Sequence, residues 1–122
     1  MSAKSPEHVH PEFVCVFNSG KLDAVLAMYE PRAGMDAEAG KFVHGHEAIR
    51  GVLEGYLSLK GSISVKTIRC VQVGELAVLH GDWTLDGRGT DGKPVKLNGK
   101  TTEVIRRQPD GSWKYVIDLP DE

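Results

Sequence analysis

The order of the elements predicts an α+β domain in which three helices precede an antiparallel sheet and cover one of its faces. Apolar residues recur at helical spacing up to about residue 59, and they alternate with polar residues from residue 62 onward. Turn residues separate the alternating segments at Gly74-Glu75, near Asp91-Gly92 and at Pro109 to Gly111. Together these observations indicate consecutive strands joined by hairpins.

Three helices are expected in the first half of the chain, at Pro11 to Asn18, Lys21 to Tyr29 and about Glu47 to Leu59. Each carries apolar residues three and four positions apart, and a glycine or proline follows each segment. The stretch Arg32 to Val43 looks irregular, and it could form two short strands around Gly40.

Four strands are expected in the second half, at Ser62 to Val73, Leu76 to Asp86, Val95 to Arg107 and Ser112 to Leu119. The pair Asn98-Gly99 inside the third strand could turn a hairpin, but its flanks are short, which favours a bulge in a long bent strand.

Composition indicates one ordinary globular domain spanning residues 1–122, with a flexible end at residues 1–10. The chain has 15 basic and 17 acidic residues and a formal net charge of −2, with no basic patch for nucleic acid. No apolar run is long enough to cross a membrane. Cys15 and Cys70 are far apart in sequence and fit buried free thiols in a reducing, cytoplasmic setting.

Two motifs resemble binding sites and are better explained otherwise. The GxGxxG at Gly87 to Gly92 lacks the following helix that a dinucleotide fingerprint needs, and Pro94 comes two residues later, so we expect a hairpin loop. The pairs His8/His10 and His44/His46 have no recognised zinc spacing around them, so we expect no metal site and exposed side chains, with His46 near a helix cap.

The segment LAVLHGDWTLDG, residues 76–87, has one polar and one apolar face. Successive side chains of a strand point to opposite faces, so His80, Asp82 and Thr84 share one face. Leu79, Trp83 and Leu85 share the other face, which is apolar. We interpret the polar face as the lining of a pocket.

Three stretches of the chain, in this order, are FNSGKLDAVLAMYEPRA, VHGHEAIRGVL and TTEVIRRQPDGSWKYVIDLP. They resemble the nuclear transport factor 2-like superfamily, and within it the SnoaL-like and ketosteroid-isomerase-like small bacterial proteins. The resemblance implies a cystatin-like, cone-shaped fold, in which a curved antiparallel sheet wraps around three N-terminal helices and leaves a pocket. It also implies a homodimer through the outer face of the sheet, here Leu79, Trp83 and Leu85.

The resemblance also implies which side chains line the pocket. On the strands these are Val78, His80, Asp82, Thr84, Thr101, Glu103, Ile105, Val116 and Asp118. The helices would add apolar walls through Phe13, Phe17 and Tyr56, whose spacing is equally typical of a core.

The catalytic residues of the steroid isomerases carry over poorly. The general base falls on or next to Ala37 and the oxyanion tyrosine on Phe13, and only the second oxyanion donor has a carboxyl counterpart, at Glu103. We therefore expect a different set of groups. His80 would exchange protons near neutral pH, and Glu103 or Asp118 would orient it or act as the acid.

Two functions remain open on this basis. The first is a cofactor-independent isomerase, cyclase or dehydratase acting on a small apolar or amphipathic molecule. The second is a non-catalytic, dimeric ligand-binding or interaction module in which the pocket is vestigial. If His80 only belongs to a satisfied hydrogen-bond network, its role is structural, which agrees with the second function.

Overall fold

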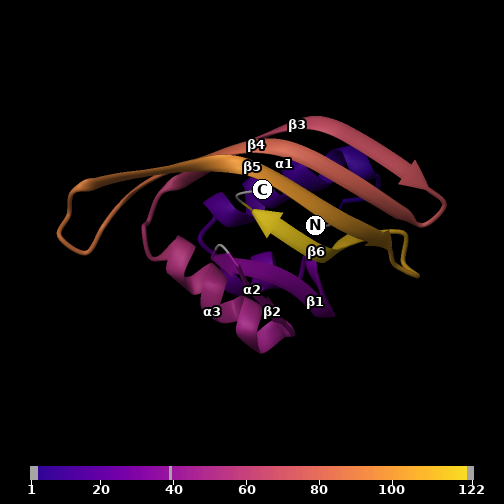
Figure 1. The fold of residues 1–122 in the computed structure, drawn as a ribbon, viewed down its shortest axis with the longest axis horizontal. Helices are drawn as coiled ribbons and strands as arrows, with labels where there is room; N and C mark the ends of the chain where they lie inside the picture. Colours follow the sequence, from indigo (N-terminus) through magenta and orange to yellow (C-terminus); the bar gives the residue numbers. More distant parts are fainter. Residues whose placement is uncertain (1–2, 39, 121–122) are drawn as a thin grey trace.

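Three helices lie on the concave side of a curved sheet (Figure 1). The computed structural model describes residues 3–38 and 40–120. The helices are α1 (Val9–Asn18), α2 (Leu22–Leu26) and α3 (His46–Leu57), and a short 3₁₀ turn, η1 (Pro6–His8), precedes α1. The strands are β1 (Tyr29–Glu38), β2 (Lys41–His44), β3 (Ser62–Val73), β4 (Leu76–Arg88), β5 (Pro94–Arg107) and β6 (Trp113–Pro120).

The six strands form one sheet in the order β2-β1-β6-β5-β4-β3. All neighbours are antiparallel except β1 and β6, which run parallel. The long strands β3, β4 and β5 arch over the helices, and the β4–β5 hairpin extends beyond the rest of the molecule (Figure 1). The arch leaves space between the sheet and the helices, which the core and the site described below occupy.

The α+β class and the order of the elements agree with the sequence prediction. The segment after the second helix forms two strands, β1 and β2, in agreement with the pair of strands allowed for Arg32 to Val43, and β1 joins the sheet beside β6. The second helix is shorter than expected. Tyr29 begins β1 instead of ending that helix, and Tyr115 N–H donates to the Met28 carbonyl at 2.8 Å.

Irregularities in the strand register lie at two places in the long strands. One leaves Ile68 of β3 unpaired between Thr67 and Arg69, and the other leaves Val116 of β6 unpaired opposite the step from Val104 to Ile105 of β5. Such bulges bend a strand and increase its twist, which suits the arch. The pairing of β4 with β5 is regular across Asn98 and Gly99, so neither a bulge nor a hairpin forms there. The GxGxxG segment forms the β4–β5 hairpin loop, as predicted.

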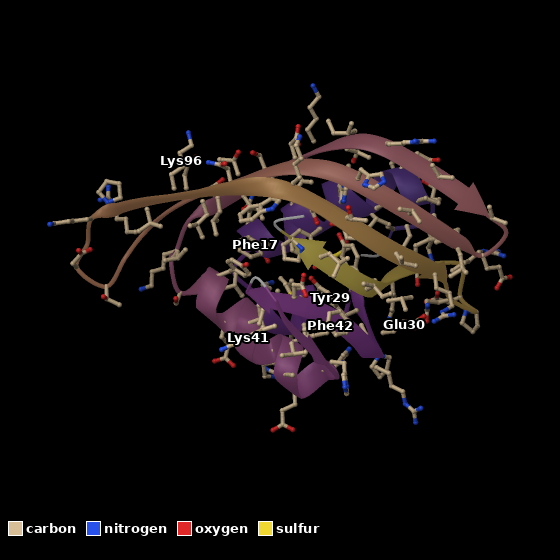
Figure 2. The ribbon with its side chains drawn as sticks, viewed as in Figure 1. Phe17, Tyr29, Glu30, Lys41, Phe42 and Lys96 are labelled. Atoms are coloured by element: carbon tan, nitrogen blue, oxygen red, sulfur yellow. The ribbon has the colours of Figure 1, made fainter. Side chains whose placement is uncertain are left out.

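The core lies between the concave face of the sheet and the helices. Large side chains from both layers are fully buried in it, among them Val9, Val25, Tyr29, Ile49, Leu53, Leu79, Leu85, Ile105 and Tyr115. Phe17 of α1 and Tyr29 of β1 lie on this inner side, whereas the Lys96 side chain of β5 points away from it (Figure 2).

Residues 3–10, within the end expected to be flexible, pack against the domain. Ala3 and Val9 are buried, and Trp113 N–H donates to the Ala3 carbonyl at 3.0 Å. Residues 1 and 2 lie outside the described residues. Cys15 and Cys70 are both free thiols, but neither is fully buried as expected, since Cys15 is exposed and Cys70 is half-buried. Within residues 3–38 and 40–120, no helix is long and apolar enough to cross a membrane.

Candidate functional site

A small cavity opens between the concave face of the sheet and helices α1 and α3. The cavity has a volume of about 50 Å³, which accommodates a few water molecules or a ligand of similar size. Most of its wall is apolar: Phe13, Phe17, Met35, Leu53, Ile63, Val65, Trp83, Leu85 and Pro120. Tyr56 and Tyr115 add aromatic rings, and the other polar lining residues are His10, Thr101, Glu103 and Asp118.

Hydrogen bonds with His10 and Thr101 hold the Glu103 carboxyl at the cavity wall. His10 Nε2 lies 2.7 Å from Glu103 Oε1, and the Thr101 hydroxyl donates to Oε2 at 2.9 Å. The other ring nitrogen of His10, Nδ1, lies 2.7 Å from the Thr67 hydroxyl on β3. His10 and Glu103 are both buried, so this network fastens α1 to β5 and β3 in an apolar interior. When Glu103 is ionised it only accepts, and Nε2–H of His10 is the donor.

Asp118 faces the same cavity from β6. The Tyr29 hydroxyl donates to Asp118 Oδ2 at 2.6 Å. Glu103 and Asp118 are directly opposite each other across the β5–β6 ladder, an arrangement that disfavours two like charges. Burial, together with the negative charge of Glu103, raises the pKa of Asp118 to about 8, although the Tyr29 hydrogen bond opposes the shift. Asp118 is therefore mostly a neutral acid at pH 7.

Four aromatic rings in successive contact lie beside the cavity. Phe13 stacks on Phe17 with centroids 5.7 Å apart and meets Tyr115 edge-on at 5.9 Å. Tyr115 in turn lies 4.9 Å from Tyr29. Burial raises the pKa of Tyr29 and of Tyr115 well above the usual tyrosine value, and the nearby carboxyls add to the effect. Both tyrosines are thus neutral at physiological pH.

Comparison with known protein families identifies the family of this chain. The model of the SnoaL-like domain matches residues 11–116, which is most of the chain. The chain belongs to the SnoaL-like domain family. Comparison with curated proteins gives no match.

Solved structures share the fold of this SnoaL-like domain at low sequence identity. A ketosteroid isomerase-like protein from Erwinia carotovora atroseptica superposes with a TM-score of 0.81 at 14% identity, over 93% of this chain and 90% of that one. A putative calcium/calmodulin-dependent protein kinase type II association domain from Thiobacillus denitrificans gives 0.76 at 18%, over 100% and 99%. An NTF2-like protein with a cystatin-like fold from Novosphingobium aromaticivorans gives 0.73 at 12%, over 93% and 78%.

Six of the residues expected at the pocket of the SnoaL-like domain do line the cavity: Phe13, Phe17, Tyr56, Thr101, Glu103 and Asp118. Ile105 shares the inner face of β5 but is packed in the core and does not line the cavity. Val116 is half-buried at the bulge, where the ladder pairs Ile117 with Val104 and Tyr115 with Ile105, so Tyr115 takes the inward place.

The expected orientation of β4 is wrong. Val78, His80, Asp82 and Thr84 face away from the cavity, and His80 is exposed and bonded to the Thr102 hydroxyl at 3.1 Å. The cross-strand pairing explains this, because Glu103 pairs with Leu79 and must share a face with it. The polar face of β4 is the solvent face, and its Asp82 pairs with Lys100 there.

The residues expected at a dimer surface are consequently inside the domain. Leu79 and Leu85 are fully buried and Trp83 is 7% exposed, all on the inner face of β4. Trp83 and Leu85 line the cavity. The alternation along this strand separated the two faces correctly, but the face assigned to the pocket was the wrong one.

His10 was expected to be an exposed side chain in a flexible end, but it is buried and lines the cavity. In the structure α1 begins at Val9, and Pro11 is accommodated in the first helical turn, where its missing N–H costs nothing. His10 then lies three residues before Phe13 and seven before Phe17, on the same helix face. Extending the helical stripe of Phe13 and Phe17 back by one turn would have identified it.

Two of the other His-x-His residues, His8 and His46, have ordinary hydrogen-bond partners. His8 Nδ1 lies 2.9 Å from the Ser5 hydroxyl, and His46, the first residue of α3, lies 2.8 Å from the Tyr29 carbonyl. In the described part of the chain, no three His, Cys, Asp or Glu side chains gather in a way that could hold a metal ion.

Replacing His10 tests its assignment as the buried partner of Glu103. We expect His10→Ala to lower the free energy of unfolding by about 3 kcal/mol, because the buried carboxyl loses its partner. The matched variant His80→Ala on the outer face should change it by less than about 0.5 kcal/mol. Urea unfolding at pH 7 measures both, and equal losses in the two variants would contradict the assignment.

The raised pKa of Asp118 predicts a specific pH dependence of stability. Between about pH 4 and pH 8 the folded chain keeps a proton on Asp118 that the unfolded chain has released, so stability falls as the pH rises through this window. The slope due to this group is at most about 1.4 kcal/mol per pH unit. Asp118→Asn should remove this component of the loss between pH 5 and pH 8.

The exposed variant Asp82→Asn is the control for this measurement, and it should follow the wild type across the window. Thermal unfolding at several pH values compares the three proteins. An Asp118→Asn curve parallel to the wild-type curve would show that Asp118 titrates normally in the folded chain.

Proposed function

We propose that this SnoaL-like domain binds a small, mostly apolar molecule with one polar group in the cavity and performs cofactor-independent acid-base chemistry on it. The single observation that carries the proposal is the pair of carboxyls facing one apolar cavity in different environments. Glu103 is held by His10 and Thr101, and Asp118 is kept neutral by burial. Paired titratable groups with separated pKa values are typical of sites that run acid and base steps together.

In this proposal Glu103 takes a proton from the ligand and Asp118 returns one to another position. Both Glu103 oxygens accept hydrogen bonds, which fix the carboxylate in place at the cavity wall. Tyr29 donates to Oδ2 of Asp118, so Oδ1 carries the transferable proton. In an isomerisation or cyclisation the net change is movement of a proton within the ligand. In a dehydration the proton from Asp118 goes to the leaving hydroxyl group, which departs as water. Neither case involves electron transfer. In this assignment Glu103 and Asp118 are the reacting groups, and His10 holds Glu103 in place. His80, expected from the sequence to exchange protons, takes no part.

Deuterium uptake from heavy water tests this chemistry. The protein is incubated in D₂O with a panel of small cyclic ketones, alcohols and epoxides, and mass spectrometry follows deuterium at carbon positions. We expect the wild type to catalyse uptake or isomerisation of at least one compound. Glu103→Gln and Asp118→Asn should each slow that reaction by about 100-fold or more.

His80→Ala is the matched control, and its rate should equal that of the wild type. Wild-type rates in both cavity variants would rule out the two carboxyls as the acid and base.

The alternative function is binding without turnover. Its support is the Thr67–His10–Glu103–Thr101 network, which satisfies every one of its members and so also explains these groups as structure. Thermal stabilisation by panel compounds without any chemical change would favour this module. The two free cysteines fit a reducing, cytoplasmic setting for either function.

We also propose that the domain forms a homodimer through the outer face of the sheet, at the β3–β4 hairpin. Among the described residues, four of the five exposed large apolar side chains lie on this hairpin: Ile68, Val71, Val73 and Leu76. Val73 is 79% exposed and pairs with Leu76 across the two strands. Contiguous apolar surface of this kind is typical of a self-association face.

Light scattering after size-exclusion chromatography tests the dimer. We expect the wild type to elute at twice the chain mass and Val73→Glu to elute as a monomer, because the charge would be buried without a partner. Phe42→Glu, on the exposed β2, should remain dimeric. A monomeric wild type would refute the proposed interface.

A further inference from the structure

Trp83 lines the cavity and carries an unpaired hydrogen-bond donor. Its side chain lines the cavity wall and is only 7% exposed. Its Nε1 is buried and has no hydrogen-bond partner in the described part of the chain. A buried donor left unpaired costs about 1 to 3 kcal/mol, and tryptophans inside proteins usually pair this group. The ring that carries this unpaired donor lines the cavity.

The position of the Trp83 ring is fixed by its neighbours. Tyr56 of α3 meets it edge-on with centroids 6.3 Å apart, and Val65 of β3 is its cross-strand partner. Both neighbours also line the cavity. A rigid ring keeps its N–H direction, so a ligand gains the hydrogen bond without ordering a mobile side chain.

The chemistry of the wall restricts the ligand group that meets Trp83. An indole N–H only donates, so the partner must be an acceptor. Glu103 and Asp118 line the same cavity, so an anionic acceptor such as a carboxylate would meet a like charge. The surrounding wall is apolar, which favours a neutral molecule. A carbonyl oxygen on a small ring or chain meets all three requirements.

We propose that the Trp83 Nε1–H donates a hydrogen bond to the carbonyl oxygen of a small neutral ketone or aldehyde in the cavity. This inference rests on the proposed function, because it takes the cavity as the ligand site. In it Trp83 orients the ligand, and the carbonyl end lies at the β4 wall. The rest of the molecule then lies beside the carboxyls on β5 and β6.

The test is an NMR titration of the wild-type protein with two probes of the same shape, cyclopentanone and methylenecyclopentane. Only the ketone has an acceptor in place of the exocyclic carbon. The indole resonances of Trp83 and Trp113 report hydrogen bonding, and the methyl group of Met35, which lines the cavity, reports occupancy. Trp113 is the chain's other tryptophan and does not line the cavity, so it serves as an internal control.

We expect both probes to shift the Met35 methyl resonance, and only the ketone to move the Trp83 indole proton downfield. Trp113 should not respond to either probe. If the ketone shifts Met35 but moves the Trp83 proton no more than the hydrocarbon does, the proposal is wrong while the cavity remains a ligand site. If neither probe shifts Met35 or Trp83, the proposal and the proposed function both lose their binding site.

A variant isolates the hydrogen bond from the packing of the ring. Trp83→Phe keeps an aromatic ring against Tyr56 and removes the donor. The extra space affects both probes alike, so the ratio of their dissociation constants reports the hydrogen bond alone. We expect the preference for the ketone to fall about fivefold, in line with one neutral hydrogen bond. An unchanged ratio would overturn the proposal, and Trp113→Phe should leave the ratio at its wild-type value.

Discussion

The opposition of Glu103 and Asp118 across two neighbouring strands is the constraint around which the interior is organised. Two carboxyls in an apolar space cannot both be ionised without a large cost. The chain resolves this by treating them differently. The Glu103 carboxylate accepts hydrogen bonds from the His10 imidazole and the Thr101 hydroxyl. Asp118 accepts one from the Tyr29 hydroxyl and keeps its proton at neutral pH.

Two of the groups that satisfy the carboxyls, His10 and Tyr29, come from outside the β5–β6 ladder. His10 belongs to the first helix and Tyr29 begins the first strand, so the polar network also determines how these elements sit on the sheet. The same contacts thus serve packing and chemistry. Apolar rings around them exclude water, which makes each hydrogen bond stronger and any missing partner more costly.

Much of the fold was predictable, because the change from helical to alternating periodicity along the chain is pronounced. The inner face of β4 was not. Alternation tells which side chains share a face, but the choice of face depends on register with the neighbouring strand, here Leu79 opposite Glu103. Tyr29 was assigned to a helix because its local pattern continues Leu22 and Val25. It forms a strand instead because it is buried in the core and pairs with Tyr115 of β6.

The parallel pairing of β1 with β6 has a consequence for how the domain is made. β6 is the last strand in the chain, and it lies between β1 and β5 in the sheet. The contacts from His10 to Glu103 and from Tyr29 to Asp118 span 93 and 89 residues. Loops of that length close late in folding. During synthesis the helices and β1 emerge before β6, so their apolar faces stay uncovered until the last strand of the sheet has been made.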